Sequence, residues 1–161
     1  MNEITGAVIG MRNFDFTEID DLYQEIILDH YRTPRNQKYL ENADIATEGM
    51  NPFCGDEVEI QIKLSNGTVE DVSFRGVGCS ISCASTSILG EAIKGKNLDE
   101  AQLLYMCFRD MMYGKDLSGY GDIDMGEAEA LAGVKNFPIR IKCALLAWAT
   151  LQDAIDKYAE K

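Results

Sequence analysis

Apolar residues first recur at regular spacing between residues 17 and 31. They lie three or four positions apart, as on one face of an α-helix. These positions are Ile19, Leu22, Tyr23, Ile26 and Ile27. Thr17 has a side chain suited to an N-cap, and Pro34 cannot continue a helix. The pattern therefore predicts a first helix that begins near Thr17 and ends before Pro34.

Strict alternation of apolar and polar residues replaces the helical spacing at residues 57–64. Such alternation is typical of a strand with one buried face. The asparagine–glycine pair at 66–67 favours a tight hairpin, and a second alternating segment follows at about 69–78. Val69 is out of phase with the apolar residues that follow it. A β-bulge near Glu70 would restore the phase and is therefore predicted.

Two further helices are expected in the C-terminal half of the chain. The first covers about residues 80–95, with Ser80 or Ser82 as its N-cap and a glycine at its end. The second is long, covers about residues 137–158, and has Pro138 in its first turn. Both carry apolar residues at helical spacing, so each is expected to bury one face.

Another helix is predicted between these two, and its ends are well marked. Asn97 is a suitable N-cap, and Glu100 stands three residues later, where a capping box needs it. Gly114 is placed to end the helix. Its apolar face is expected to comprise Ala101, Leu104, Tyr105, Phe108, Met111 and Met112.

The order of these elements predicts an α+β fold with helices packed on a small antiparallel sheet. Residues 37–53 show neither period and are expected to be a connection. Residues 1–16 are interpreted as a flexible leader, and 17–161 as a single domain. An insertion at about 114–135 is expected to form an exposed loop followed by one or two helical turns.

Composition and charge narrow the classes of function. The chain has 161 residues and a net charge of −12 at pH 7, without a cluster of Lys or Arg. Nucleic-acid binding depends on such clusters, so no nucleic-acid partner is expected. No apolar run approaches the roughly 18 residues of a spanning helix, and no signal peptide is recognised at the start. A cytoplasmic, monomeric protein without a membrane partner is expected.

The five cysteines are the main candidates for chemistry. Their odd number in a cytoplasmic chain argues against a disulfide framework. Cys54 stands in a turn, Cys79 at the junction of a strand and a helix, and Cys143 near the start of the last helix. Cys83 and Cys107 stand inside helical patterns, and we interpret both as core residues.

Cys54, Cys79 and Cys143, together with Asp56, offer three sulfurs and one oxygen. Such a set suits tetrahedral Zn²⁺ or an iron–sulfur cluster. Spacings of 25 residues and then 64 residues between the cysteines match no general zinc-finger pattern, so structural roles stay open for each. His30 is the only histidine, and we expect it to form a local hydrogen bond rather than to bind a metal.

The sequence resembles the IscU-like family of iron–sulfur cluster assembly proteins from about residue 20 to residue 156. The first helix and its end, "LYQEIILDHYRTPRN", match the family, as do the three cysteine motifs "NPFCGDEVEI", "GVGCSISCAS" and "IRIKCALLAW". The resemblance implies an IscU/NifU N-terminal-like fold with about three antiparallel strands. It also implies zinc held by Cys54, Asp56, Cys79 and Cys143.

Two departures resemble the SufU branch of that family. Lys142 stands where scaffolds that work with an Hsp70 chaperone have a histidine, and "GKDLSGYGDIDMG" forms the insertion. The branch implies a cysteine desulfurase of the SufS type as partner, with downstream iron–sulfur assembly proteins as further candidates. It argues against an Hsp70 partner.

Residues and resemblance together suggest a sulfurtransferase mechanism. Sulfur transfer needs a thiolate, and a thiol held by zinc is already deprotonated. Cys54, beside Gly55, is the thiolate best placed to leave the metal and attack a persulfide when the desulfurase docks. Asp56 is the hard ligand among soft ones, and Arg140 and Lys142 could offset the negative charge of the site.

Three other functions remain open at this point. The same ligands could assemble a [2Fe–2S] cluster, or bind iron, as a scaffold that supplies apo-proteins. A non-catalytic, zinc-stabilised interaction module is an alternative of another class. A zinc hydrolase is disfavoured, since it needs an open water position and a nearby general base.

Overall fold

The computed structural model describes residues 21–52 and 54–160. Its elements, in chain order, are α2 (Asp21–Arg32), β1 (Ile45–Asn51), β2 (Asp56–Ser65), β3 (Thr68–Val77), α3 (Ser80–Ile93), α4 (Leu98–Met112), the 3₁₀ helices η2 (Ser118–Tyr120) and η3 (Gly126–Asn136), and α5 (Pro138–Ala159). The three strands form one antiparallel sheet in the order β1-β2-β3. This is the predicted α+β architecture.

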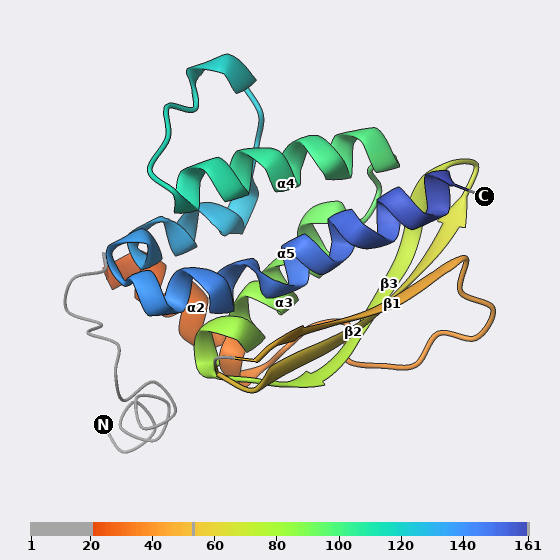
Figure 1. The fold of residues 1–161 in the computed structure, drawn as a ribbon, viewed down its shortest axis with the longest axis horizontal. Helices are drawn as coiled ribbons and strands as arrows, with labels where there is room; N and C mark the ends of the chain where they lie inside the picture. Colours follow the sequence, from red (N-terminus) through yellow and green to blue (C-terminus); the bar gives the residue numbers. More distant parts are fainter. Residues whose placement is uncertain (1–20, 53, 161) are drawn as a thin grey trace.

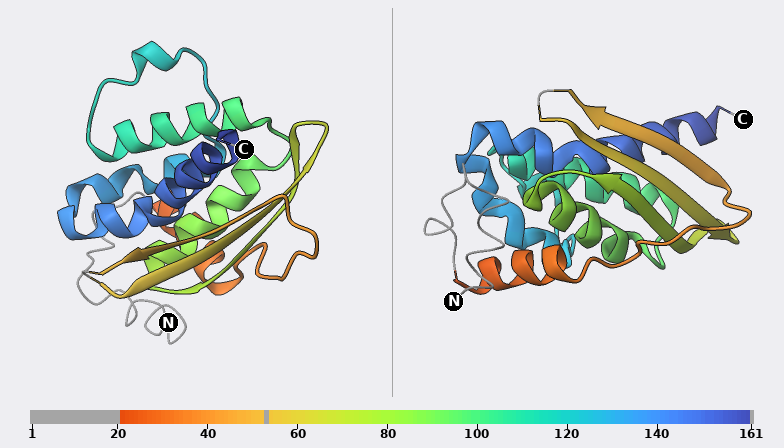
Figure 2. Two further views of the ribbon diagram at one scale, coloured as in Figure 1. Left: turned by 45° about the vertical axis from the view of Figure 1, so that its right-hand side comes forward. Right: turned by 90° about the horizontal axis from the view of Figure 1, so that it is seen from below.

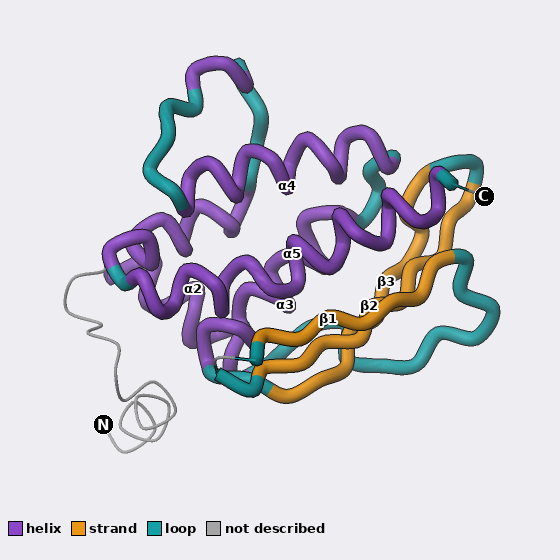
Figure 3. Tube along the Cα trace, in the orientation of Figure 1, coloured by secondary structure: helices purple, strands orange, loops and turns teal. Residues whose placement is uncertain are grey.

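The helices cover one face of the sheet, as Figures 1 and 3 show. α3 and α5 pack directly on the strands, and α4 lies on the side of α5 away from the sheet. The right-hand view of Figure 2 shows the sheet from the side opposite to the helices. None of the helices in the described part of the chain is long and apolar enough to span a membrane.

A buried aromatic pair joins three of the helices. The rings of Trp148 in α5 and Phe108 in α4 stack with their centroids 4.1 Å apart. The indole N–H of Trp148 donates to Ser85 Oγ in α3 at 2.9 Å, and Ser85 Oγ donates to the carbonyl of Ala144 at 2.6 Å. The polar atoms of this part of the core are therefore paired, as a buried indole and hydroxyl require.

The predicted hairpin and bulge are both confirmed. Asn66 and Gly67 have φ angles of 54° and 78°, the left-handed pair that a two-residue hairpin turn needs. The pairing of β2 with β3 shifts between Lys63 and Leu64, so that Glu70 has no residue opposite it. The extra residue brings the apolar positions of both strands to the helix-covered face.

The prediction that residues 37–53 form only a connection is wrong, because they contain β1. The inward-facing positions of β1 show why the apolar period is missing. Gly49 faces α5 so closely that a Cβ atom there would collide with the Thr150 hydroxyl. Thr47 is only half-buried, so Ile45 is the one fully buried apolar residue of the strand. A strand with small and polar inward residues has no alternating hydrophobic pattern to detect.

The helix ends that the structure describes agree with prediction except at the start of α3. The N-cap of α3 is Cys79, whose side chain forms no capping hydrogen bond, while Ser80 and Ser82 lie buried inside the helix. The capping box of Asn97 and Glu100 is present at α4. The cysteine therefore occupies the position at which backbone N–H groups point towards solvent and ligands.

The segment that follows α4 stands out from the helices, as Figure 1 shows. Tyr120 fixes it to α4 by donating a 2.6 Å hydrogen bond to Asp110. The helical part is longer than the expected one or two turns, because η3 spans Gly126–Asn136. The predicted N-cap Thr17 and the leader at 1–16 lie outside the described residues.

Candidate metal centre

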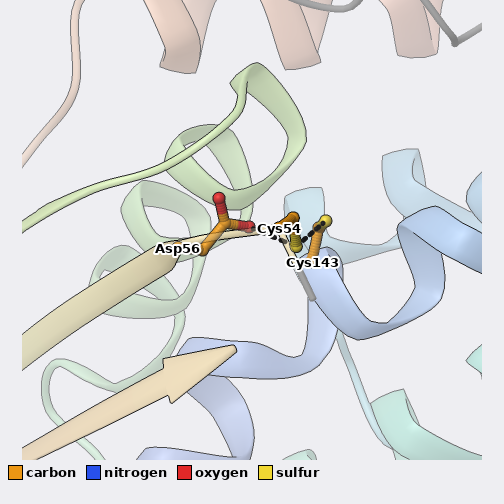
Figure 4. A group of neighbouring side chains, drawn as sticks. All are labelled: Cys54, Asp56 and Cys143. Atoms are coloured by element: carbon orange, nitrogen blue, oxygen red, sulfur yellow. Dashed lines mark hydrogen bonds between the residues drawn. The ribbon is translucent and has the colours of Figure 1, made fainter. Parts of the chain in front are cut away.

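Three segments that are distant in sequence meet at one end of the sheet. The turn between β1 and β2 carries Cys54 and leads into Asp56, the first residue of β2. Cys79 caps α3, and Cys143 lies in the second turn of α5. Figure 4 shows the side chains of Cys54, Asp56 and Cys143 pointing towards one another. The predicted ligands therefore come from three separate elements.

The donor atoms of this group are close together. Cys54 Sγ lies 3.3 Å from Cys143 Sγ and 3.4 Å from Asp56 Oδ2. The ligand atoms of these three residues all lie within 4.8 Å of one another. Cys79 Sγ lies 3.9 Å from Asp56 Oδ2. The fold thus brings three of the four sequence-predicted ligands into one group, and Cys79 adjoins this group through Asp56.

The turn that carries Cys54 is shaped by its neighbours. Gly55 adopts a φ of +70°, which a residue with a side chain rarely does, and its N–H donates to the carbonyl of Asn51 at 2.9 Å. Asn51 and Asp56 are directly opposite each other in the β1–β2 pair. The loop between them is therefore short and fixed at both ends.

Asp56 also ties this turn to α3. Its Oδ1 accepts a hydrogen bond from the backbone N–H of Cys79 at 3.1 Å, so Oδ2 remains directed towards the sulfurs. The side chain is only 1% exposed. A buried carboxylate needs such partners. Asp56 consequently positions Cys79 in addition to offering a ligand oxygen.

Accessibility differs sharply among the three thiols. Cys143 is buried, Cys79 is half-buried, and Cys54 is exposed. A thiol must meet an external reactant to exchange sulfur with it. Cys54 is therefore the member of the group best placed to do so.

The thiols also differ in acidity. A hydrogen bond from Cys143 lowers the pKa of Cys79 to about 6, assisted by the backbone N–H of Ser82. That same bond raises the pKa of Cys143, and burial raises it further. The pKa of Cys54 is raised, chiefly by burial and also by Asp56. Without a metal, these opposite shifts favour Cys79 as the thiolate and Cys143 as its hydrogen-bond donor.

Arg140 lies one helical turn before Cys143, and its Nη1 is 3.9 Å from Cys143 Sγ. Its Nε is buried and has no hydrogen-bond partner among the described residues. The guanidinium is placed to stabilise negative charge on the sulfurs. Lys142 instead lines a groove on the α4 side of α5.

The remaining candidates lie apart from this group. Cys107 is buried in the core, and Cys83 is half-buried one helical turn beyond Cys79, with its Sγ 3.6 Å from the carbonyl of Gly78. His30 is buried and contacts Ser87 Oγ at 2.7 Å and Glu127 Oε1 at 3.0 Å. These contacts agree with a hydrogen-bonding role for His30, although its partners lie on α3 and η3 rather than nearby in sequence.

Sequence reasoning missed one polar contact to the exposed thiol. The side-chain amide of Asn51 donates to Cys54 Sγ at 2.9 Å, and Asn51 is buried. The asparagine was visible in the motif "NPFCGD", where its position before proline indicated only a turn. Its contact with the sulfur depends on how the turn folds back.

The donor set fits a zinc ion. Three sulfurs and one carboxylate oxygen match the ligands that structural and sulfur-rich zinc sites use, and the same set suits iron–sulfur chemistry. Two thiolates bound to one zinc ion at about 2.3 Å stand roughly 3.7 Å apart. The 3.3 Å between Cys54 and Cys143 is close to that spacing.

Known proteins are similar to this chain in sequence and fold. The profile of the family described as NifU-like N terminal domain matches residues 22–144. The zinc-dependent sulfurtransferase SufU of Bacillus subtilis (strain 168) is 47% identical over 86% of this chain and 92% of its own. The iron–sulfur cluster assembly scaffold protein IscU of Streptococcus pyogenes serotype M1 is 38% identical over 89% of this chain and 88% of its own.

A solved structure agrees with these matches. The crystal structure of FiSufU from the thermophile Fervidobacterium islandicum AW-1 superimposes with a TM-score of 0.76. It is 34% identical and the match covers 88% of this chain and 99% of FiSufU. Sequence and fold lead to the same conclusion: the chain belongs to the family of NifU-like N-terminal domains.

Proposed function

We propose that this protein assists iron–sulfur cluster assembly by accepting sulfur from a cysteine desulfurase on Cys54. One observation supports this most directly: Cys54 is the exposed member of a cluster with Asp56 and Cys143, which are buried, and the adjacent Cys79 is half-buried. The similarity to a zinc-dependent sulfurtransferase, at 47% identity, supports the same assignment.

Cys54, Asp56, Cys79 and Cys143 would hold the zinc ion, with Arg140 beside Cys143. When bound, zinc keeps its thiol ligands deprotonated at neutral pH and does not oxidise them, because it has no redox chemistry of its own. This would overcome the raised pKa of Cys54. Arg140 would offset part of the negative charge that three thiolates and a carboxylate bring together.

The chain's own part in the reaction is a thiol–disulfide exchange. The Cys54 thiolate attacks the outer sulfur of the persulfide on the desulfurase, and a new sulfur–sulfur bond forms on Cys54. The bond between that sulfur and the desulfurase cysteine breaks, and this cysteine leaves as a thiolate. The exchange is balanced, so it requires neither an oxidant nor a reductant.

The surroundings of Cys54 suit a thiol that moves during the reaction. It is exposed on a short turn beside Gly55, whereas Asp56 is buried and bonded to the N–H of Cys79. We therefore assign the movement to Cys54 and the anchoring to Asp56. The Asn51 amide would hold the sulfur in place until the donor arrives.

The sulfur donor in this proposal is a desulfurase of the SufS type, and downstream iron–sulfur assembly proteins would receive the sulfur. The free cysteines suit a reducing compartment such as the cytoplasm. We treat residues 17–161 as one domain and 114–135 as its insertion, and these boundaries stay a prediction.

A second candidate function uses the same ligands. The similarity to an iron–sulfur cluster assembly scaffold protein, at 38% identity, favours a chain on which a [2Fe–2S] cluster is built and passed on. A non-catalytic zinc-stabilised module is the third candidate, and it requires no exposed thiol in the metal group.

Metal content and sulfur transfer together test the proposal. The protein purified without oxygen should contain one zinc ion and lack the visible absorbance of an iron–sulfur cluster. Incubation with a SufS-type desulfurase and cysteine should add one sulfur atom to Cys54, detected by mass spectrometry of the intact protein and its peptides.

Cys54→Ser should accept no sulfur, and Cys83→Ser is the matched control because Cys83 lies outside the metal group. Sulfur acceptance by Cys54→Ser at the wild-type rate would refute the proposal. Stoichiometric iron and acid-labile sulfide with little zinc would favour the scaffold.

A further inference from the structure

A groove of about 330 Å³ lies beside the metal centre, between α4, α5 and the end of β1. We call it the α4–α5 groove. Its β1 wall is formed by Met50, Asn51 and Pro52, and its α4 wall includes Arg109 and Tyr113. The two helices run side by side in Figure 1, so the groove follows their line of contact.

The charge of the groove is opposite to that of the molecule. The described residues that line it include Arg109 and Lys142 but no aspartate or glutamate, whereas the whole chain carries a net charge of −12. Asp110 lies beside the groove and offsets part of this charge, since its Oδ1 is 3.5 Å from Arg109 Nε. The groove is therefore a local cationic surface on an acidic protein, which attracts carboxylates.

Large apolar side chains around the groove are exposed to solvent. Met50 is 61% exposed and Tyr113 is 57% exposed. Leu145 and Leu146 of α5 lie nearly buried at its base. Methionine, tyrosine and arginine are enriched at the centres of protein interfaces, where a partner covers them.

The groove leads directly to the proposed nucleophile. Asn51 forms part of its wall and also donates a hydrogen bond to Cys54 Sγ at 2.9 Å. On the opposite wall, Lys142 directly precedes Cys143. A segment bound in the groove would thus end beside the sulfur that must meet the persulfide.

We infer that the α4–α5 groove binds the segment of the sulfur donor that flanks its persulfide cysteine. This segment is an extended peptide with apolar side chains and at least one carboxylate. The apolar side chains cover Met50 and Tyr113, and the carboxylate pairs with Arg109 and Lys142. The inference rests on the proposed function, because that function supplies the donor.

Binding of the donor, measured apart from sulfur transfer, tests this inference. The probe is a purified SufS-type cysteine desulfurase, titrated into this protein in a calorimeter. We expect Arg109→Glu to weaken binding about tenfold or more, since it replaces an attraction with a repulsion. Tyr113→Asp, at the exposed rim, should weaken binding as well. Higher salt should reduce the difference between Arg109→Glu and wild type.

Lys157→Glu is the matched control. It also replaces a positive charge with a negative one, but at an exposed side chain of α5 that does not line the groove. Its binding should stay within about twofold of wild type. Zinc content and circular dichroism show whether each variant is folded and loaded. A loss of structure in Arg109→Glu leaves Tyr113→Asp as the deciding variant.

The outcomes separate this inference from the proposed function. If both groove variants bind the desulfurase with wild-type affinity, the groove is not the donor-binding site. Loss of sulfur acceptance in Cys54→Ser would still support the proposed function. If the wild-type protein does not bind the desulfurase, the inference that the groove binds the donor is also wrong. If Arg109→Glu alters self-association in sedimentation experiments without altering donor binding, the groove belongs to a second copy and the inference is wrong.

Discussion

The side-chain amide of Asn51 donates a hydrogen bond to the sulfur of Cys54 over 2.9 Å. Asn51 is the last residue of β1 and is 6% exposed, whereas Cys54 is exposed three residues later. The buried end of β1 thus holds the most accessible sulfur of the candidate metal centre. Hydrogen bonds of this kind orient metal ligands and favour the charged form of an acceptor.

Removal of this amide should loosen the site. We expect Asn51→Ala to lower zinc affinity about tenfold, the lower end of the range for residues that support a ligand. Asn51→Asp should be worse, because it keeps the shape but places a carboxylate against the thiolate. Competition with a chromophoric chelator measures both affinities without a donor protein. Equal zinc affinity in wild type and both variants would contradict the positioning role.

Asp56 bonds to the N–H of Cys79 and is proposed as a metal ligand, and different substitutions separate these two roles. Asp56→Asn keeps an oxygen that can accept the N–H of Cys79 but removes the charge offered to the metal. It should therefore lower zinc affinity and leave the stability of the metal-free protein nearly unchanged. Asp56→Ala also leaves that buried N–H without a partner, which costs about 1–3 kcal/mol.

Urea denaturation of the metal-free variants, together with chelator competition, distinguishes the two effects of Asp56. If Asp56→Asn and Asp56→Ala lose the same stability, the hydrogen bond to Cys79 does not contribute as described. If Asp56→Asn binds zinc as tightly as wild type, the carboxylate is not a ligand.

Ionisation of Cys79 predicts how the stability of the metal-free protein depends on pH. Its pKa in the folded state is about 6, well below its ordinary value of 9.0. Between these two values the unfolded chain binds a proton that the folded chain has released, so stability rises with pH. This contribution is complete above pH 9 and is lost as the pH falls through 6.

Cys143 acts in the opposite direction, because its pKa is raised in the folded state. Above the pKa of the unfolded thiol, stability should therefore decline again as pH rises. Urea midpoints of the chelated protein from pH 5 to 10 would measure both limbs. The rising limb should be weaker in Cys79→Ser, and an identical pH profile in this variant would contradict the assignment of the thiolate.

The sequence predicts those parts of the molecule in which neighbours along the chain determine the structure. Asn97 and Glu100 lie three residues apart and form the expected capping box. Phase alone located the bulge at Glu70. The family motifs indicated the cysteines and the aspartate, and the fold brings them together.

Contacts between distant segments determine what the sequence could not reveal. The amide of Asn51 reaches Cys54 only because the turn folds back. The two residues are three positions apart, as in many turns, so their spacing did not reveal the contact. The groove exists because α4 and α5 pack beside the end of β1. β1 itself was missed because one of its inward-facing positions is Gly49, where α5 leaves no room for an apolar side chain. The alternating apolar pattern of a strand is therefore interrupted.

That close contact gives a final prediction, which concerns how β1 holds the cysteine turn. A Cβ atom at position 49 would collide with the Thr150 hydroxyl, which itself donates to the carbonyl of Leu146 at 2.7 Å. We expect Gly49→Ala to lower the free energy of unfolding by about 1–3 kcal/mol, the usual cost of overpacking. Thr150→Ala removes the colliding oxygen, so it should recover part of this loss when the two changes are combined. A double-mutant cycle from urea denaturation measures the coupling, and additive effects of the two changes would show that β1 and α5 do not meet at this point.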